Sequence, residues 1–259
     1  MEEAPVRTQV EDGQALLTID RPAARNALSA PVLVGLLQAL DQVEADSTVR
    51  VVVLTGAGDR VFCAGGDLSG LPEGGSLAGH ALGRRYGTLL ERLGACSRPT
   101  IARVNGHALA GGLGLVLACD LAVAVDSAEL GTPEVDVGLF PMMVLAWLQR
   151  HVGRKRALQM VLTGDRLSAE EALRWGIVNR VVPRAELDEA IRALSRRIAG
   201  KSRAVLALGK AAFRSAEDIP LGLAMDFLAG QLSLNLGAED AAEGVAAFQE
   251  RRAPAWKDR

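Results

Sequence analysis

The segment PTIARVNGHALAGGLGLVLACDLAVAV, residues 99–125, decides the fold class. Pro99–Val104 is a short apolar run that predicts a strand, and Asn105-Gly106 after it predicts a turn. Residues 111–118 are small and apolar and predict a helix, and Leu121–Val125 predicts a second strand. A strand, a helix and a strand in this order imply a parallel crossover, so the sequence predicts an α/β fold.

The chain before this segment carries similar signals. Val6–Val10 and Ala15–Ile19 alternate around Asp12-Gly13, which predicts a β-hairpin. Ser29 is placed to cap a following helix. Val49–Thr55 is rich in β-branched residues and predicts a strand buried on both faces.

Beyond about residue 140 the pattern becomes helical. Ser168 and Glu171 have the spacing of a capping box, and Gly176 stands where that helix should end. From Ala185 onward there is almost no strand signal, and the apolar helix faces there need a covering surface. Residues 69–80 are rich in Gly, Ser and Pro and predict a mobile loop.

Composition limits the class of protein. A net charge of −2 over 259 residues gives no reason to expect nucleic acid as a partner. No apolar stretch reaches the roughly 20 residues of a membrane span, and the acidic N-terminus lacks a secretory signal. Three scattered cysteines and three isolated histidines argue against disulfides and metal sites. We therefore expect a cytoplasmic protein.

Two glycine-rich segments carry the chemical signal: FCAGGDL (62–68) and NGHALAGG (105–112). Each follows a predicted strand, and glycines there leave backbone N–H groups accessible to a ligand. Two such turns that face one point form an oxyanion hole. For either segment alone, close helix–strand packing is the better explanation of the glycines, and the two segments together in one α/β chain favour the oxyanion hole. A dinucleotide site at Leu54-Thr-Gly-Ala-Gly58 is a weaker alternative because the third glycine of that motif is missing.

These segments, with others in the same order, resemble the enoyl-CoA hydratase/isomerase family, also called the crotonase family. The remaining matching motifs are DRPAARNALS (20–29), ACD (118–120), LTGDRLSAEEA (162–172), GIVNRVVP (176–183) and FQERRAPAW (248–256). Because they span nearly the whole chain, the resemblance is specific.

The resemblance implies an architecture and a substrate. Residues 1–195 would form a spiral core of ββα units with the CoA-thioester site, and residues 196–259 a helical region for trimerisation. The partner would be an acyl-CoA thioester, and the chain would assemble as a homotrimer or a dimer of trimers. No separate cofactor is implied, since coenzyme A is part of the substrate.

The resemblance also assigns site residues. The amides of Gly66 and Gly111 would bind the thioester oxygen and stabilise an enolate. Arg25 would lie near the nucleotide end of CoA. The stretch that would line the CoA arm comprises Ala64, Gly65, Gly66, Asp67 and Leu68, with Asp67 also accepting backbone hydrogen bonds at the turn.

The catalytic carboxylates depart from the hydratase pattern. Hydratases of the family use two glutamates, and the position of the first is Gly114 here, while the second is kept as Glu134. After Gly138, the apolar residues 139–144 replace the glycine-rich turn typical of hydratases, which predicts a more apolar water pocket. In a dry pocket the pKa of Glu134 should rise toward neutrality, which suits a base beside a thioester. Taken alone, a glutamate after a proline is usually a solvated surface residue.

A single carboxylate suits isomerisation of a 3-enoyl-CoA to a 2-enoyl-CoA, where one group moves a proton between C2 and C4. This is the reaction that we predict. A 2-enoyl-CoA hydratase is the nearest alternative, followed by a malonyl-type decarboxylase and by a non-catalytic family member that binds CoA.

Overall fold

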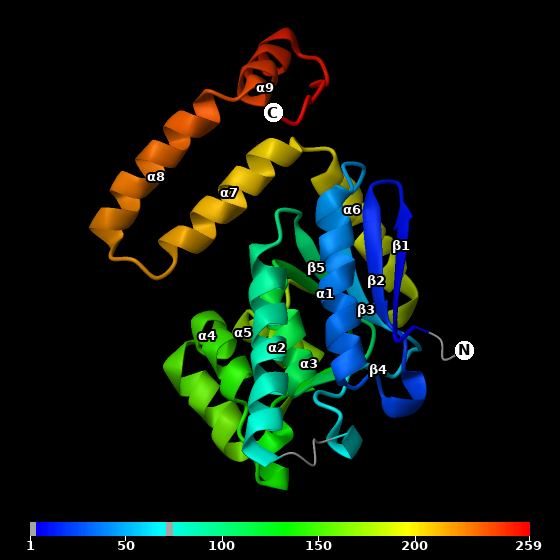
Figure 1. Cartoon of the computed structure of the whole chain (residues 1–259). Helices are drawn as coiled ribbons and strands as arrows, with labels where there is room; N and C mark the ends of the chain where they lie inside the picture. Colours follow the sequence, from blue (N-terminus) through cyan, green and yellow to red (C-terminus); the bar gives the residue numbers. More distant parts are fainter. Residues whose placement is uncertain (1–3, 71–74) are drawn as a thin grey trace.

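Two sheets form the centre of the molecule (Figure 1). The computed structural model describes residues 4–70 and 75–259. The strands are β1 (Val6–Glu11), β2 (Gln14–Ile19), β3 (Val51–Gly56), β4 (Val61–Cys63), β5 (Thr100–Val104), β6 (His107–Leu109), β7 (Leu121–Val125), β8 (Glu129–Gly131), β9 (Arg166–Ser168) and β10 (Arg180–Val182).

Strand order shows how the chain winds. One sheet has the order β1-β2-β3-β5-β7-β10 and the other the order β4-β6-β8-β9. Successive turns of the chain place one strand in each sheet: β3 then β4, β5 then β6, and β7 then β8. Neighbours within these three turns are parallel, whereas β1 with β2 and β8 with β9 are antiparallel. The predicted α/β spiral of ββα units is confirmed.

Helices cover these turns and form most of the C-terminal part. They are α1 (Ala30–Ala45), α2 (Gly75–Ala95), α3 (Gly111–Ala118), α4 (Met142–Thr163), α5 (Ala169–Trp175), α6 (Leu187–Ala199), α7 (Arg203–Ala216), α8 (Leu221–Leu236) and α9 (Glu239–Glu250), with short 3₁₀ turns η1 (Pro22–Ala24), η2 (Leu68–Gly70), η3 (Pro133–Val137) and η4 (Arg184–Glu186). The helical path of α4 is interrupted at Gly153, where φ is 74°. Within residues 4–70 and 75–259, no helix has the length and apolarity to cross a membrane.

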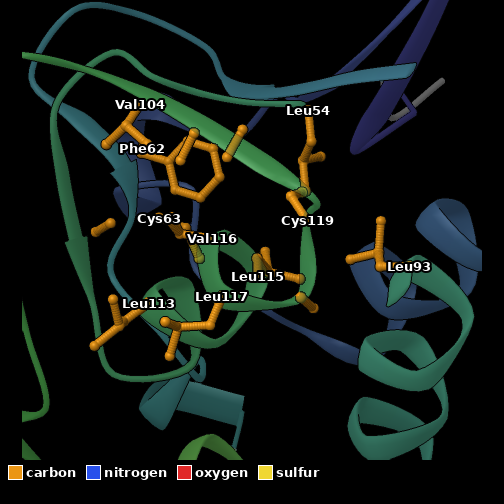
Figure 2. Packing of buried hydrophobic residues seen from close by; sticks show 14 of the residues in the cluster. Leu54, Phe62, Cys63, Leu93, Val104, Leu113, Leu115, Val116, Leu117 and Cys119 are labelled. Carbon is orange, nitrogen blue, oxygen red and sulfur yellow. The ribbon is translucent and has the colours of Figure 1, made fainter. Parts of the chain in front are cut away.

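The core is centred on α3, which is apolar on all sides. Leu113, Leu115, Val116 and Leu117 are buried, and Figure 2 shows them near Phe62 and Cys63 of β4. A helix surrounded in this way by strands and by other helices is rigid because each of its faces is packed. The N-terminal turn of α3 is therefore a fixed platform.

The C-terminal helices extend from the core. In Figure 1, α7 and α8 form an antiparallel pair that lies away from both sheets, with α9 at its far end. Polar contacts attach α7 to the core: Lys210 bonds the carboxylate of Asp120 and the carbonyl of Arg98. The predicted division at residue 195 falls inside α6, whose Leu187 and Ile191 are buried in the core. That division stays a prediction.

One local prediction is wrong. The loop predicted over 69–80 is replaced by η2 at Leu68–Gly70 and by helix from Gly75 onward, and residues 71–74 lie outside the described part. Helix α2 buries Tyr86, Leu89 and Leu93. Packing of this apolar face stabilises the helix, so its glycine-rich first turns remain helical despite their low propensity.

Candidate active site

The two glycine-rich segments lie against each other. Gly65, with φ of 95°, adopts a conformation that favours glycine, and a Cβ there would collide with Ala110 and lie 3.1 Å from the amide nitrogen of Gly111. The turn before α3 is also strained, since Ala110 has φ of 51°. The sequence predicted that these turns face one point, and the structure brings them together.

The amides of Gly66 and Gly111 are available to a ligand. Within the described residues, neither N–H donates a hydrogen bond to a protein acceptor. Gly66 is exposed, and a Cβ built on it would meet no atom within 4 Å. Gly111 is the first residue of α3, where the helix has orphan N–H groups and the positive end of its dipole. Two free donors at this point can stabilise a developing oxyanion.

Residues 64–68, which were predicted to line the CoA arm, run alongside the segment that contains Arg25 and Leu28, and together they form one continuous edge of the site. A parallel bridge joins Leu28 to Gly66, and the amide of Ala64 donates to the carbonyl of Arg25 at 3.1 Å. Arg25 therefore lies beside this edge, and both Arg25 and Leu68 are exposed. A ligand that extends from the Gly66 amide toward Arg25 would follow this edge.

Asp67 has its carboxylate engaged by protein groups. It accepts hydrogen bonds from the Ser69 amide at 3.2 Å and the Ser69 hydroxyl at 2.6 Å, and it pairs with Arg21 at 2.8 Å. The Ser69 and Arg21 hydrogen bonds hold the pKa of Asp67 below its usual range. The predicted backbone hydrogen bond is therefore present, and Asp67 fixes the shape of the turn.

Glu134 reaches the same region through strand register. Leu109 of β6 pairs with Gly131 of β8, and the Ala110 amide donates to the Gly131 carbonyl at 2.8 Å. The chain then enters η3, where Pro133 favours the helical turn that carries Glu134. The turn that precedes Gly111 and the turn that carries Glu134 are consequently neighbours.

The side chain of Glu134 is half-buried, and one oxygen of its carboxylate lacks a hydrogen-bond partner among the described residues. Its Oε2 atom is shielded from solvent, and within the described residues it has no hydrogen-bond partner. Burial raises the pKa of Glu134 from its ordinary 4.5 to about 6, although a bond to its own amide opposes the rise. A half-buried carboxylate that titrates near neutrality can both take and return a proton.

Gly114 stands at the position that the family resemblance assigns to the first glutamate of hydratases. It is buried in α3, and Val144 at the start of α4 packs beside it, 3.1 Å from where a Cβ would be. Val144 belongs to the apolar segment that the sequence singled out. Val144 therefore presents an apolar surface to Gly114, and the more apolar water pocket stays a prediction.

Sequence reasoning missed Tyr86 of α2. Its hydroxyl donates to the Gly111 carbonyl at 2.6 Å, and a Cβ at position 114 would overlap its oxygen. Tyr86 is the one tyrosine of the chain, and it precedes Gly111 by 25 residues. A glycine in a packed helix signals that a large neighbour fills the gap, but it does not identify that neighbour.

Two cysteines and one histidine near these turns are buried or engaged by protein groups. The thiols of Cys63 and Cys119 are buried, and burial raises the pKa of each to about 12. His107 accepts a hydrogen bond from the amide of Glu129 at 3.1 Å.

After β3 the chain enters strand β4 rather than a helix, so a dinucleotide turn is not formed at residues 54–58. In the described parts of the chain, His, Cys, Asp and Glu form no group of three that could hold a metal.

Comparisons with known proteins show which family the chain resembles. Residues 9–259 match the family model for enoyl-CoA hydratase/isomerase. The chain is 39% identical over 260 residues to the enoyl-CoA hydratase domain-containing protein 3, mitochondrial, of Rattus norvegicus, covering 96% of this chain and 83% of that protein.

Two further relatives cover almost the full length. The short-chain-enoyl-CoA hydratase of Clostridium acetobutylicum is 34% identical, with 97% of each chain covered. The crystal structure of an enoyl-CoA hydratase from Mycobacterium smegmatis superposes with a TM-score of 0.95 at 38% identity, covering 98% of this chain and 99% of that one. The chain therefore belongs to the enoyl-CoA hydratase/isomerase family of enzymes, which act on CoA thioesters.

Proposed function

We propose that this enzyme converts 3-enoyl-CoA thioesters to 2-enoyl-CoA thioesters, with Glu134 as its one acid–base group. The observation that carries the proposal is the solvent-shielded Oε2 of Glu134, which has no hydrogen-bond partner among the described residues, while position 114 is a glycine. The site has one carboxylate, whereas hydration of a 2-enoyl-CoA is best catalysed by two.

The proposed reaction conserves every atom. The Glu134 carboxylate takes a proton from C2, and the electron pair of that C–H bond enters a dienolate. The amides of Gly66 and Gly111 bind the thioester oxygen as negative charge gathers on it. The protonated Glu134 then gives its proton to C4, and the double bond lies between C2 and C3.

Hydration of 2-enoyl-CoA is the second candidate, and it is favoured by the names of relatives. The Clostridium acetobutylicum protein is called a short-chain-enoyl-CoA hydratase, and that of Syntrophomonas wolfei a crotonyl-CoA hydratase. With Gly114 in place of an acidic residue, Glu134 alone would have to activate water and deliver the proton.

A substrate comparison separates the two reactions. Purified enzyme is offered a 3-enoyl-CoA and, separately, a 2-enoyl-CoA, and ultraviolet absorbance reports the conjugated thioester. Isomerisation creates this absorbance from the first substrate, whereas hydration removes it from the second. We expect the first reaction to be the faster. Faster loss of conjugation would favour the hydratase, and binding of CoA esters without either reaction would favour the decarboxylase or the non-catalytic alternative.

We also propose that the C-terminal helices mediate a homotrimer or a dimer of trimers. Large apolar side chains project into solvent from α7, α8 and α9: Phe213, Leu232, Leu234, Leu236 and Phe248. Exposed apolar area of this extent commonly marks a protein interface. Light scattering should give a mass of three or six chains, and a monomer at micromolar concentration would contradict this proposal.

We place the enzyme in the cytoplasm and assign it no cofactor besides the CoA of its substrate. The three cysteines are unpaired and buried, which suits a reducing compartment. Some relatives carry a mitochondrial name, so fractionation of the source cells is the test. Activity of protein passed through a desalting column and a chelator tests the absence of a cofactor.

A further inference from the structure

Tyr86 joins helix α2 to the first turn of α3. Its side chain is 7% exposed, and its hydroxyl donates to the carbonyl of Gly111 at 2.6 Å. Gly111 is also the residue whose free amide faces the oxyanion position. The phenol therefore lies at the reacting end of the pocket, although it comes from a different helix.

The phenol fills the volume that glycine leaves at position 114. A Cβ there would overlap the Tyr86 hydroxyl oxygen and lie 3.2 Å from the ring carbon Cζ. A Cβ on Gly111 would come within 3.4 Å of the same ring. No side chain at 114 fits while Tyr86 stays in place, because overlap with a packed aromatic side chain forces one of them to move.

Tyr86 brings no second acid–base group into the pocket. Burial, with smaller contributions from Cys63 and Glu134, raises the pKa of its hydroxyl well above the ordinary value. The phenol is consequently neutral at physiological pH, and its single proton is already donated to Gly111. It can neither accept a proton from water nor readily give one to substrate.

We propose that Tyr86 is a specificity-determining residue: its phenol occupies the volume beside Gly114 and keeps a second carboxylate, or a water bound to one, from the acyl carbons. The inference rests on the proposed single-glutamate isomerisation. Hydration forms a bond from water oxygen to C3 and one from a proton to C2, so it needs a held water as well as a proton carrier. The phenol takes the volume at 114 from which a second group could hold that water.

Thermal unfolding tests the geometry without any assay of activity. Gly114→Ala should lower Tm by several degrees because its methyl overlaps the Tyr86 oxygen. Tyr86→Phe removes that oxygen, so the double variant should unfold at a higher temperature than Gly114→Ala alone. Gly79→Ala, also in a helix but with no atom within 4 Å of its Cβ, is the matched control and should not lower Tm. Additive effects of the two substitutions would overturn the proposed packing.

The reaction itself is tested by the variant Tyr86→Ala/Gly114→Glu. Position 114 lies one helical turn after Gly111, so a carboxylate there can face the same ligand once the phenol is gone. We expect hydration of a 2-enoyl-CoA to increase at least tenfold over the wild type. Tyr86→Ala/Gly114→Gln has nearly the same volume without the charge and should not show this gain.

Failure of the proposed function and failure of the proposed role of Tyr86 give different results. Wild-type enzyme that does not isomerise a 3-enoyl-CoA refutes the proposed function, whatever the variants do. A folded Tyr86→Ala/Gly114→Glu enzyme that binds acyl-CoA without a gain in hydration refutes the role of Tyr86. If that variant does not fold, the unfolding temperatures of the Gly114→Ala series decide the question.

Discussion

The candidate active site has two sides, the Glu134 wall and the Tyr86 wall, which differ in how the hydrogen-bonding capacity of their polar groups is satisfied. On one wall Glu134 has an oxygen without a hydrogen-bond partner in the described part of the chain, and its pKa is raised to about 6. On the other wall the Tyr86 hydroxyl donates to the Gly111 carbonyl and stays neutral. Buried polar atoms usually have partners, and an unsatisfied one has a cost that function commonly explains. The comparison indicates that the Glu134 wall performs the chemistry and that the Tyr86 wall limits it.

Removing the negative charge of Glu134 should have the largest effect on the rate of isomerisation. Glu134→Gln keeps the shape of the side chain but cannot carry the proton, so isomerisation should fall by about 10²- to 10⁴-fold. Initial rates with a 3-enoyl-CoA measure the loss. Glu129→Gln changes a half-buried glutamate on β8 that pairs with Arg166, and it serves as the control with activity near that of the wild type. Unchanged rates in Glu134→Gln would remove this residue from the mechanism.

A smaller effect is expected at the oxyanion position. Gly66→Ala places a methyl where no protein atom lies within 4 Å, so the fold should tolerate it while the thioester is displaced. We expect kcat/KM to fall about 10- to 100-fold, with Tm unchanged within roughly 2 °C. Gly79→Ala should leave both quantities near their wild-type values. A loss of Tm that parallels the loss of activity would mean that Gly66 matters for folding alone.

The pH dependence of kcat/KM should report the Glu134 wall alone. Glu134 acts as a base only when ionised, so kcat/KM should rise with pH through about 6 and be roughly tenfold lower at pH 5 than on the plateau. Tyr86 should add no descending limb up to pH 10, since burial raises its pKa. A bell-shaped profile centred near neutrality would indicate a second titrating group in the reaction.

The smallest expected effect is on stability. Because the folded protein holds a proton on Glu134 up to about pH 6 and the unfolded chain only to about 4.5, stability is lost as pH rises between these values. The loss is smaller than the roughly 2 kcal/mol that the full shift would give, because the side chain is only half-buried and solvent screens its charge. Glu134→Gln lacks this titration, so its Tm relative to the wild type should increase from pH 4.5 to pH 7. Parallel Tm curves for the two proteins would contradict the raised pKa.

Local signals in the sequence predicted most of the spiral. The Asp12-Gly13 hairpin forms, and Ser168 makes both hydrogen bonds of its capping box with Glu171. Ser29 does occupy the N-cap of α1, but its side chain makes no capping bond. These features depend on neighbouring residues, and hence on information that a short window of sequence contains.

The position of Tyr86 against Gly111 and Gly114 could not be predicted from such local signals. Its role depends on the packing of α2 against α3, and the glycine-rich start of α2 suggested a loop instead. Glu134 was identified only through the family motif, since its burial results from the register of β6 with β8 and from the turn η3. Residues brought together by tertiary contacts leave little trace in local sequence patterns.

The central claim is that one carboxylate both removes and returns the proton. A 3-enoyl-CoA with deuterium at C2, turned over in ordinary water, tests this directly by mass spectrometry and NMR of the 2-enoyl product. Since Oε2 of Glu134 is shielded from solvent, the account predicts that part of the deuterium appears at C4 in the first turnover. A product with only solvent hydrogen at C4 from the first turnover onward would show that the hydrogen added there is not the one removed from C2, and it would contradict the account.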